Sequence, residues 1–208
     1  MSPGEDRGVI ILAGGDSKRL GCPKPILPLA GVPLIKRIIH RLESYFNVIT
    51  VITDRRELFQ GLPVKIGGDL LIGYKKSPLR GIHAGLTMSP LPYQFVIACD
   101  MPFVNLELVK RMAVYAPHYD VVVPRINDQY EPLHAYYSRD CAQVIEKALA
   151  AGSFKVIDFY SRLKVKEIGL EEILSVDPRR ESFFNINTWE DYQRAENMLA
   201  VTGGERNV

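Results

Sequence analysis

Short apolar runs and longer amphipathic segments alternate along this chain. The runs are rich in β-branched residues, as in VITVIT at residues 48–53, and such runs predict buried strands. We expect strands at residues 9–12, 48–53, 64–66, 94–99, 120–124, 133–137 and 164–168. The segments between most of these strands are long enough to hold a helix.

Apolar residues recur at helical spacing in the longer segments. Residues 33–45 carry one such stripe, with charged residues on the opposite face, and predict a helix. Thr188 and Asp191 have the spacing of a capping box, which favours a helix start near Trp189. Further helices are expected at about residues 80–88, 106–115, 140–151, 154–163 and 189–199, with a short helix or turn at 54–56 and a loop at 70–78.

This order of elements predicts the fold class. Strands that alternate with helices favour a mostly parallel sheet with helices on both faces, so we expect a three-layer, doubly wound α/β fold. No internal repeat, low-complexity linker or break in composition divides the sequence. We therefore expect a single domain over residues 1–208, with mobile tails at residues 1–7 and 202–208.

Composition narrows the class of protein. With 208 residues, of which 47% are apolar and 24% charged, the chain resembles an ordinary globular domain. The net charge of +2 argues neither for nor against a nucleic-acid partner. Because there is no dense basic tract, we expect no such partner. Cys22, Cys99 and Cys141 are too scattered for a disulfide framework or a paired metal site. Without a signal-peptide pattern or an apolar run near the roughly 18 residues of a membrane span, we expect a cytoplasmic protein.

A glycine-rich loop follows the first predicted strand. Ala13, Gly14 and Gly15 end the apolar run, and three cations follow at Lys18, Arg19 and Lys24. Backbone N–H groups of such a loop can wrap a polyphosphate, and the cations can neutralise it, although a glycine loop can also be a plain turn. The spacing fits neither a Walker A motif nor the dinucleotide G-x-G-x-x-G.

Four further polar positions are candidates for the same site. Asp100 follows the strand at 94–99, so it lies at the same sheet edge as the glycine loop, where ligands bind in open α/β sheets. It is either a Mg²⁺ ligand, since Mg²⁺ often takes one carboxylate plus phosphates and water, or a turn residue. Asp69, after two glycines, could contact a nucleoside or belong to a turn, and Asn185 and Asn187 could be turn or N-cap residues. The four histidines show no zinc spacing, and no G-x-S-x-G nucleophile elbow occurs.

Several motifs together resemble one known family. They are LAGGDSKRLGCPK at residues 12–24, LAGVPL at 29–34, PLRG at 78–81, CDMPF at 99–103 and FFNINTWED at 183–191. This set is similar to the molybdenum cofactor guanylyltransferases, and it runs over nearly the whole chain. The resemblance implies the fold of the nucleotide-diphospho-sugar transferases, which is glycosyltransferase-A-like.

The resemblance also implies an activity and a set of site residues. The family transfers GMP from GTP to the phosphate of molybdenum-molybdopterin, with Mg²⁺ as cofactor and molybdoenzyme-maturation proteins as possible partners. The implied roles are backbone contacts to GTP from the glycine loop, triphosphate contacts from two cations, a nucleotide contact from one aspartate, and contacts to both nucleotide and Mg²⁺ from a second aspartate. In that order the residues are Leu12, Ala13, Gly14 and Gly15, then Arg19 and Lys24, then Asp69 and Asp100.

Two positions depart from the family pattern. Pro23 stands where the family usually has an aspartate before the loop lysine, and a nucleotide-contacting asparagine aligns near Ile52. That contact is either missing or supplied by Thr53 or Asp54. Candidates for the acceptor pocket are Arg80, Lys75, Lys76 and the segment Asn185–Asn187. The alternatives to guanylyl transfer are a relative that uses CTP or a sugar 1-phosphate, and a non-catalytic nucleotide-binding module.

Overall fold

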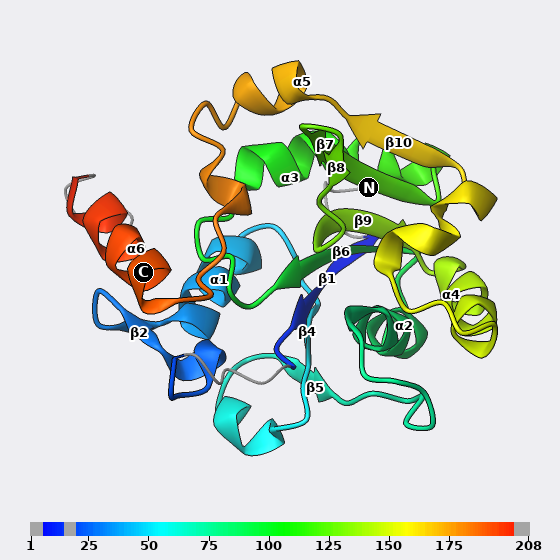
Figure 1. The fold of residues 1–208 in the computed structure, drawn as a ribbon, viewed down its shortest axis with the longest axis horizontal. Coiled ribbons are helices and arrows are strands. Elements are labelled where there is room, and N and C mark those ends of the chain that lie inside the picture. Colours follow the sequence, from blue (N-terminus) through cyan, green and yellow to red (C-terminus); the bar gives the residue numbers. More distant parts are fainter. Residues whose placement is uncertain (1–5, 15–19, 202–208) are drawn as a thin grey trace.

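The computed structural model describes residues 6–14 and 20–201, and one mixed sheet runs through it (Figure 1). The strand order is β10-β7-β9-β6-β1-β4-β5, with β8 paired to β7. The strands of this sheet are β1 (Arg7–Leu12), β4 (Ile49–Ile52), β5 (Lys65–Gly67), β6 (Tyr93–Ala98), β7 (Val121–Ile126), β8 (Gln129–Tyr130), β9 (His134–Ser138) and β10 (Val165–Ile168). A separate hairpin joins β2 (Pro28–Leu29) to β3 (Val32–Pro33).

The half of the sheet that carries the predicted site is parallel. β1 pairs with β4 and with β6 in parallel, and β4 pairs with β5 in parallel. β9 runs antiparallel between β6 and β7, and β10 is again parallel to β7. The carboxyl ends of β5, β4, β1 and β6 therefore lie along one edge, as expected for a mostly parallel sheet.

Helices cover both faces of the sheet, which confirms the predicted three layers (Figure 1). Alternate strand residues point to opposite faces, so Ile11 packs with α1 and α3 whereas Ile10 packs with α2 and α4. The helices are α1 (Leu34–Glu43), α2 (Pro78–Met88), α3 (Leu106–Ala113), α4 (Cys141–Ala150), α5 (Leu170–Leu174) and α6 (Trp189–Val201). Gly85 lets α2 approach β1 closely, since a Cβ at this position would lie 2.6 Å from the Ile10 side chain.

A third apolar cluster attaches α6 and the hairpin to the sheet. Leu29 from the hairpin, Leu34 from α1 and Leu199 from α6 belong to it. Tyr192 donates its hydroxyl to the Pro28 carbonyl at 2.7 Å, and the Ala30 amide donates to Glu196 at 2.7 Å. α6 thus holds the β2–β3 hairpin in place, and this hairpin directly follows the segment that carries Lys24.

The structure differs from the sequence prediction at several elements. Arg7, expected in a mobile tail, is the first residue of β1 and pairs in register with Tyr93. The segment 154–163 is not an α-helix, because Val156–Arg162 forms a 3-10 helix. α2 begins at Pro78, inside the expected loop, since proline suits the first position of a helix. The capping box is confirmed, with the Asp191 amide donating to the Thr188 hydroxyl at 3.1 Å. The tails 1–5 and 202–208 lie outside the described residues.

Candidate functional site

Four strand ends are joined by backbone hydrogen bonds beyond their last ladder residues. The Cys99 amide donates to the Leu12 carbonyl at 3.0 Å, and the Ala13 amide donates to the Ile52 carbonyl at 2.9 Å. The Thr53 amide continues this row to the Gly67 carbonyl at 2.9 Å. The residues that follow β1, β4, β5 and β6 are therefore fixed side by side.

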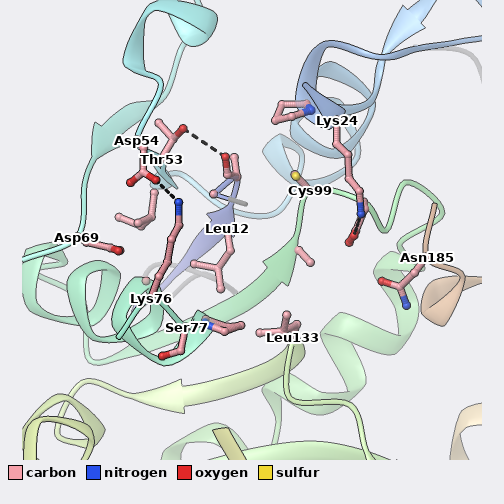
Figure 2. A pocket seen from close by; sticks show the side chains of 18 residues that line it. Leu12, Lys24, Thr53, Asp54, Asp69, Lys76, Ser77, Cys99, Leu133 and Asn185 are labelled. Carbon is pink, nitrogen blue, oxygen red and sulfur yellow. Dashed lines mark hydrogen bonds and ion pairs between the residues drawn. The ribbon is translucent and has the colours of Figure 1, made fainter. Parts of the chain in front are cut away.

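A cavity of about 470 Å³ opens at this edge. Leu12 lies in its middle, with Lys24 and Asn185 on one side and Asp54 and Lys76 on the other (Figure 2). The cavity is lined by Leu12, Ala13, Gly14, Lys24, Pro25, Ile52, Thr53, Asp54, Asp69, Lys76, Ser77, Pro78, Gly81, Ala98, Cys99, Asp100, Leu133 and Asn185. A volume of this size fits a nucleotide-sized ligand.

Lys24 and Asp100 form an ion pair on one side of the cavity. The Lys24 ammonium nitrogen lies 2.7 Å from Asp100 Oδ2 and 2.6 Å from Asn187 Oδ1. Lys24 begins a short 3-10 helix (Lys24–Ile26), and Asp100 follows β6. Both side chains are less than one-fifth exposed, so their charges are screened far less than those of a surface pair.

The second carboxylate oxygen of Asp100 has no hydrogen-bond partner among the described residues, although it is buried. A buried acceptor without a partner is costly unless a ligand or ion satisfies it. The Ile186 amide donates to the Asp100 carbonyl at 3.0 Å, which holds the turn in place. In the described part of the chain, no three His, Cys, Asp or Glu side chains gather as a metal site. The donor set therefore fits an ion such as Mg²⁺, which takes one carboxylate together with phosphate and water.

Asp69 and Arg80 form a second ion pair at the opposite end. Arg80 Nη2 lies 3.1 Å from Asp69 Oδ2, and Arg80 Nη1 donates to the Tyr74 carbonyl at 2.8 Å. Burial raises the pKa of the Asp69 carboxyl, and the Arg80 guanidinium acts against this by favouring the charged form. Arg80 thus favours the charged form of the partly buried Asp69 carboxylate at the cavity wall.

A third pair, between Asp54 and Lys76, lies at the mouth of the same end (Figure 2). The Lys76 ammonium donates to Asp54 Oδ2, and both side chains are about half exposed. Thr53 holds the turn before Asp54, since its hydroxyl donates to the Ala13 carbonyl at 3.2 Å and accepts from the Arg55 amide at 3.0 Å. Thr53 and Asp54, which the sequence offered as replacements for the missing asparagine, both line the cavity.

Cys99 is the only cysteine among the residues that line the cavity. Its thiol is buried, and burial, together with the neighbouring Asp100 charge, raises its pKa to about 12. The thiol is therefore protonated at neutral pH, which excludes it as a nucleophile.

Most of the predicted site residues lie together. Leu12, Ala13, Gly14, Lys24, Asp69 and Asp100 all line the cavity, whereas Gly15 and Arg19 lie outside the described residues. Of the candidates for the acceptor pocket, Asn185 and Lys76 line the cavity. Arg80 does not line it but forms an ion pair with Asp69, which does. Lys75 is not among the lining residues. Sequence reasoning missed the contact of Asn187 with Lys24 and the Asp54–Lys76 pair, because the partners are far apart in the chain.

Comparisons with known proteins agree with this geometry. A family model, the MobA-like NTP transferase domain, matches residues 9–165. The chain is 36% identical over 197 residues to a probable molybdenum cofactor guanylyltransferase of Natranaerobius thermophilus, covering 93% of this chain and 96% of the relative. It is also 36% identical over 189 residues to a molybdenum cofactor guanylyltransferase of Desulfosudis oleivorans, covering 90% of this chain and 93% of the relative.

A solved structure extends the likeness to three dimensions. The molybdopterin-guanine dinucleotide biosynthesis protein A of Archaeoglobus fulgidus superposes with a TM-score of 0.81 at 28% identity, covering 93% of this chain and 99% of that protein. The expected nucleotidyltransferase fold is thereby confirmed. From its sequence, its fold and the residues at the sheet edge, the chain belongs to the molybdenum cofactor guanylyltransferase family, within the MobA-like NTP transferases.

Proposed function

We propose that this chain transfers GMP from GTP to the phosphate of molybdenum-molybdopterin and releases pyrophosphate. The product is the molybdopterin guanine dinucleotide form of the cofactor. The observation that carries the proposal is the Lys24–Asp100 pair beside the glycine loop. It combines a held cation with a buried carboxylate oxygen that has no partner among the described residues. The names of the curated relatives support the choice of GTP and molybdopterin.

The reaction forms one P–O bond and breaks another. An oxygen of the molybdopterin phosphate attacks the α-phosphorus of GTP, and the bond from that phosphorus to the bridging oxygen of the β-phosphate breaks. The electron pair and the bridging oxygen leave with pyrophosphate. A phosphate monoester is largely dianionic at neutral pH, so the nucleophile needs no general base from the protein.

Positioning and charge neutralisation are then the main tasks of the side chains. Lys24 neutralises the triphosphate as a point charge, and Asn187 keeps its ammonium group in place when Asp100 takes another partner. Backbone N–H groups of the loop at Ala13 and Gly14 cradle phosphate oxygens. Gly15 and Arg19 are expected to extend this cradle.

Mg²⁺ is the proposed cofactor, and Asp100 is its protein ligand. The buried Asp100 Oδ1 supplies a hard oxygen donor of the kind that Mg²⁺ prefers. When bound, the ion supplies electrostatic stabilisation of the charge on the phosphates. Lys24, which contacts the other oxygen of the same carboxylate, is well placed to bind the same phosphate groups.

The acceptor is assigned to the side of the cavity that carries Asn185. This side chain lies next to Lys24 and opposite the Asp54–Lys76 pair (Figure 2). Lys76 and Arg80 pair with carboxylates at the other end of the cavity, away from Lys24, so their position makes them weaker candidates for the acceptor phosphate. Asp69 is assigned to the nucleoside.

Thermal unfolding with a panel of nucleotides tests this assignment. GTP with Mg²⁺ should raise the melting temperature more than CTP, ATP or UTP, and ligand at a hundredfold its Kd adds about 2.7 kcal/mol to the free energy of unfolding. Asp100→Ala should lose the Mg²⁺-dependent part of this shift, whereas Asp128→Ala, an exposed aspartate outside the cavity, should keep it. A larger shift with CTP, or a full Mg²⁺ effect in Asp100→Ala, would contradict the proposal.

A further inference from the structure

The Asp54–Lys76 pair lies where the base of a bound nucleotide would be. Lys24 and Asp100 fix the phosphate end of the cavity, and Leu12 separates them from Asp54 and Lys76 (Figure 2). A nucleotide whose phosphates lie at Lys24 and whose sugar passes the glycine loop therefore brings its base to the Asp54 end. This placement rests on the proposed function.

Asp54 is also better suited than Asp69 to read a base. Asp69 has one oxygen bound to Arg80, and its side chain is only 15% exposed. Asp54 is 50% exposed, and its carboxylate has a pairing partner that is itself half exposed. An exposed ion pair contributes little to stability, so rearranging this pair around a ligand costs little.

The backbone that carries Asp54 is held in place. The Thr53 amide donates to the Gly67 carbonyl, and the Thr53 hydroxyl donates to the Ala13 carbonyl and accepts from the Arg55 amide, so Asp54 leaves the end of β4 in a defined direction. Lys76 comes two residues before Pro78, the first residue of α2. The pair thus brings a cationic donor and a carboxylate acceptor together at one rim of the cavity.

The chemistry of this pair selects among the bases. A carboxylate only accepts hydrogen bonds and has two oxygens, whereas a lysine ammonium only donates. Guanine presents the O6 acceptor beside two neighbouring donors, N1–H and N2–H₂, whereas adenine, cytosine and uracil each present one donor position on that edge. Guanine is therefore the base that satisfies both oxygens of Asp54 and the ammonium of Lys76 together.

We propose that Asp54 and Lys76 determine the base specificity of this chain. Asp54 accepts from N1–H and N2–H₂ of guanine, and Lys76 donates to O6. This assigns guanine selectivity to a pair of side chains rather than to the asparagine that Ile52 replaces.

Binding of GTP, ITP and XTP in the presence of Mg²⁺, measured by calorimetry, tests the proposal. ITP lacks the N2 amino group, so the wild-type chain should bind GTP about 10- to 100-fold more tightly than ITP. In Asp54→Asn the amide can accept from N1–H and donate to the O2 of xanthine. This variant should lose the preference for GTP over ITP and gain affinity for XTP. Lys76→Met should weaken GTP and ITP by the same factor, because both keep O6.

Two control variants make the test specific. Asp69→Asn should weaken the three nucleotides alike without favouring XTP, and Asp128→Asn should change none of them. An unchanged ratio of GTP to ITP in Asp54→Asn, or an XTP preference in Asp69→Asn instead, would overturn the proposal. If the switch occurs but no GMP is transferred to molybdopterin, the base assignment stands and the proposed reaction fails.

Discussion

His134 is a buried histidine whose two ring nitrogens have no hydrogen-bond partner among the described residues. Its ring lies between Phe95 and Phe183, with both ring centroids 5.0 Å away. Burial lowers its pKa to about 3, although the nearby Asp177 carboxylate acts in the opposite direction. His134 is therefore neutral in the folded protein throughout the physiological range.

This histidine should make the protein less stable in mild acid. Its pKa is about 3 in the folded chain and about 6.5 in the unfolded chain, so between these values the unfolded chain binds more protons. Below about pH 6.5, this residue alone should lower the free energy of unfolding by about 1.4 kcal/mol for each unit of decrease in pH. His134→Phe should remove this contribution, as measured by urea unfolding between pH 6.5 and 4.5.

The exposed His118 provides the matched control. His118→Gln should keep the wild-type dependence on pH, because its ring is in water in both states. If His134→Phe and the wild type lose stability with the same slope, the account of a neutral buried histidine is wrong.

Single site residues could be predicted where each belongs to a recognisable local motif. Lys24 and Asp100 each follow a recognisable strand end or loop, so their shared edge of the sheet could be inferred before the structure. Asp54 and Lys76 could not be paired in advance, since the contact depends on how the segment before α2 turns back toward β4. The Asp69–Arg80 pair was missed for a similar reason, because each residue alone was compatible with several roles.

The segment between the 3-10 helix at Glu181–Phe183 and α6 links three parts of the site. The side-chain oxygen of Asn187 accepts from the Lys24 ammonium at 2.6 Å. The backbone amide of Asn187 donates to the Asp191 carboxylate at 3.0 Å. The neighbouring Ile186 amide donates to the Asp100 carbonyl. The capped start of α6 therefore positions the lysine relative to Asp100.

Removal of the side-chain amide of Asn187 should impair this positioning of Lys24. In Asn187→Ala the ammonium loses an acceptor that is independent of Asp100, so kcat for GMP transfer should fall by about 10- to 100-fold. The KM for GTP should change less, because Lys24 keeps its charge. Steady-state kinetics of pyrophosphate release measure both constants. Asn197→Ala, at an exposed position of α6, should have wild-type kinetics, and equal kinetics of the two variants would contradict a positioning role.

Long periodic elements were predicted well and short ones were not. The stripe of α1 and the apolar run of β6 are strong signals, because burial on one or both faces dictates their residues. The hairpin β2–β3 has two-residue strands, and α5 spans five residues, so neither is long enough for its apolar pattern to repeat in the sequence. The segment 156–162 has helical composition but forms a 3-10 helix, whose Phe159 and Tyr160 pack in an aromatic cluster with Tyr137 of β9.

The molecule as a whole places its chemistry at one edge of a parallel half-sheet. β1, β4, β5 and β6 end along one edge. The residues directly after β1, β4 and β6 line the cavity, and so does Asp69, two residues after β5. The Lys24–Asp100 pair and the Asp54–Lys76 pair lie at opposite ends of it (Figure 2). No helix in the described part of the chain is long and apolar enough to cross a membrane.

Transfer of a radioactive label is the most direct test of the central claim. With GTP labelled at the α-phosphate, Mg²⁺ and molybdenum-molybdopterin, the wild-type chain should place the label in the dinucleotide cofactor. With GTP labelled at the γ-phosphate, the label should appear in pyrophosphate. Asp100→Ala should form neither product above background, while Asp128→Ala should match the wild type. Label that stays in GTP with the wild type, or near-normal transfer by Asp100→Ala, would contradict the account.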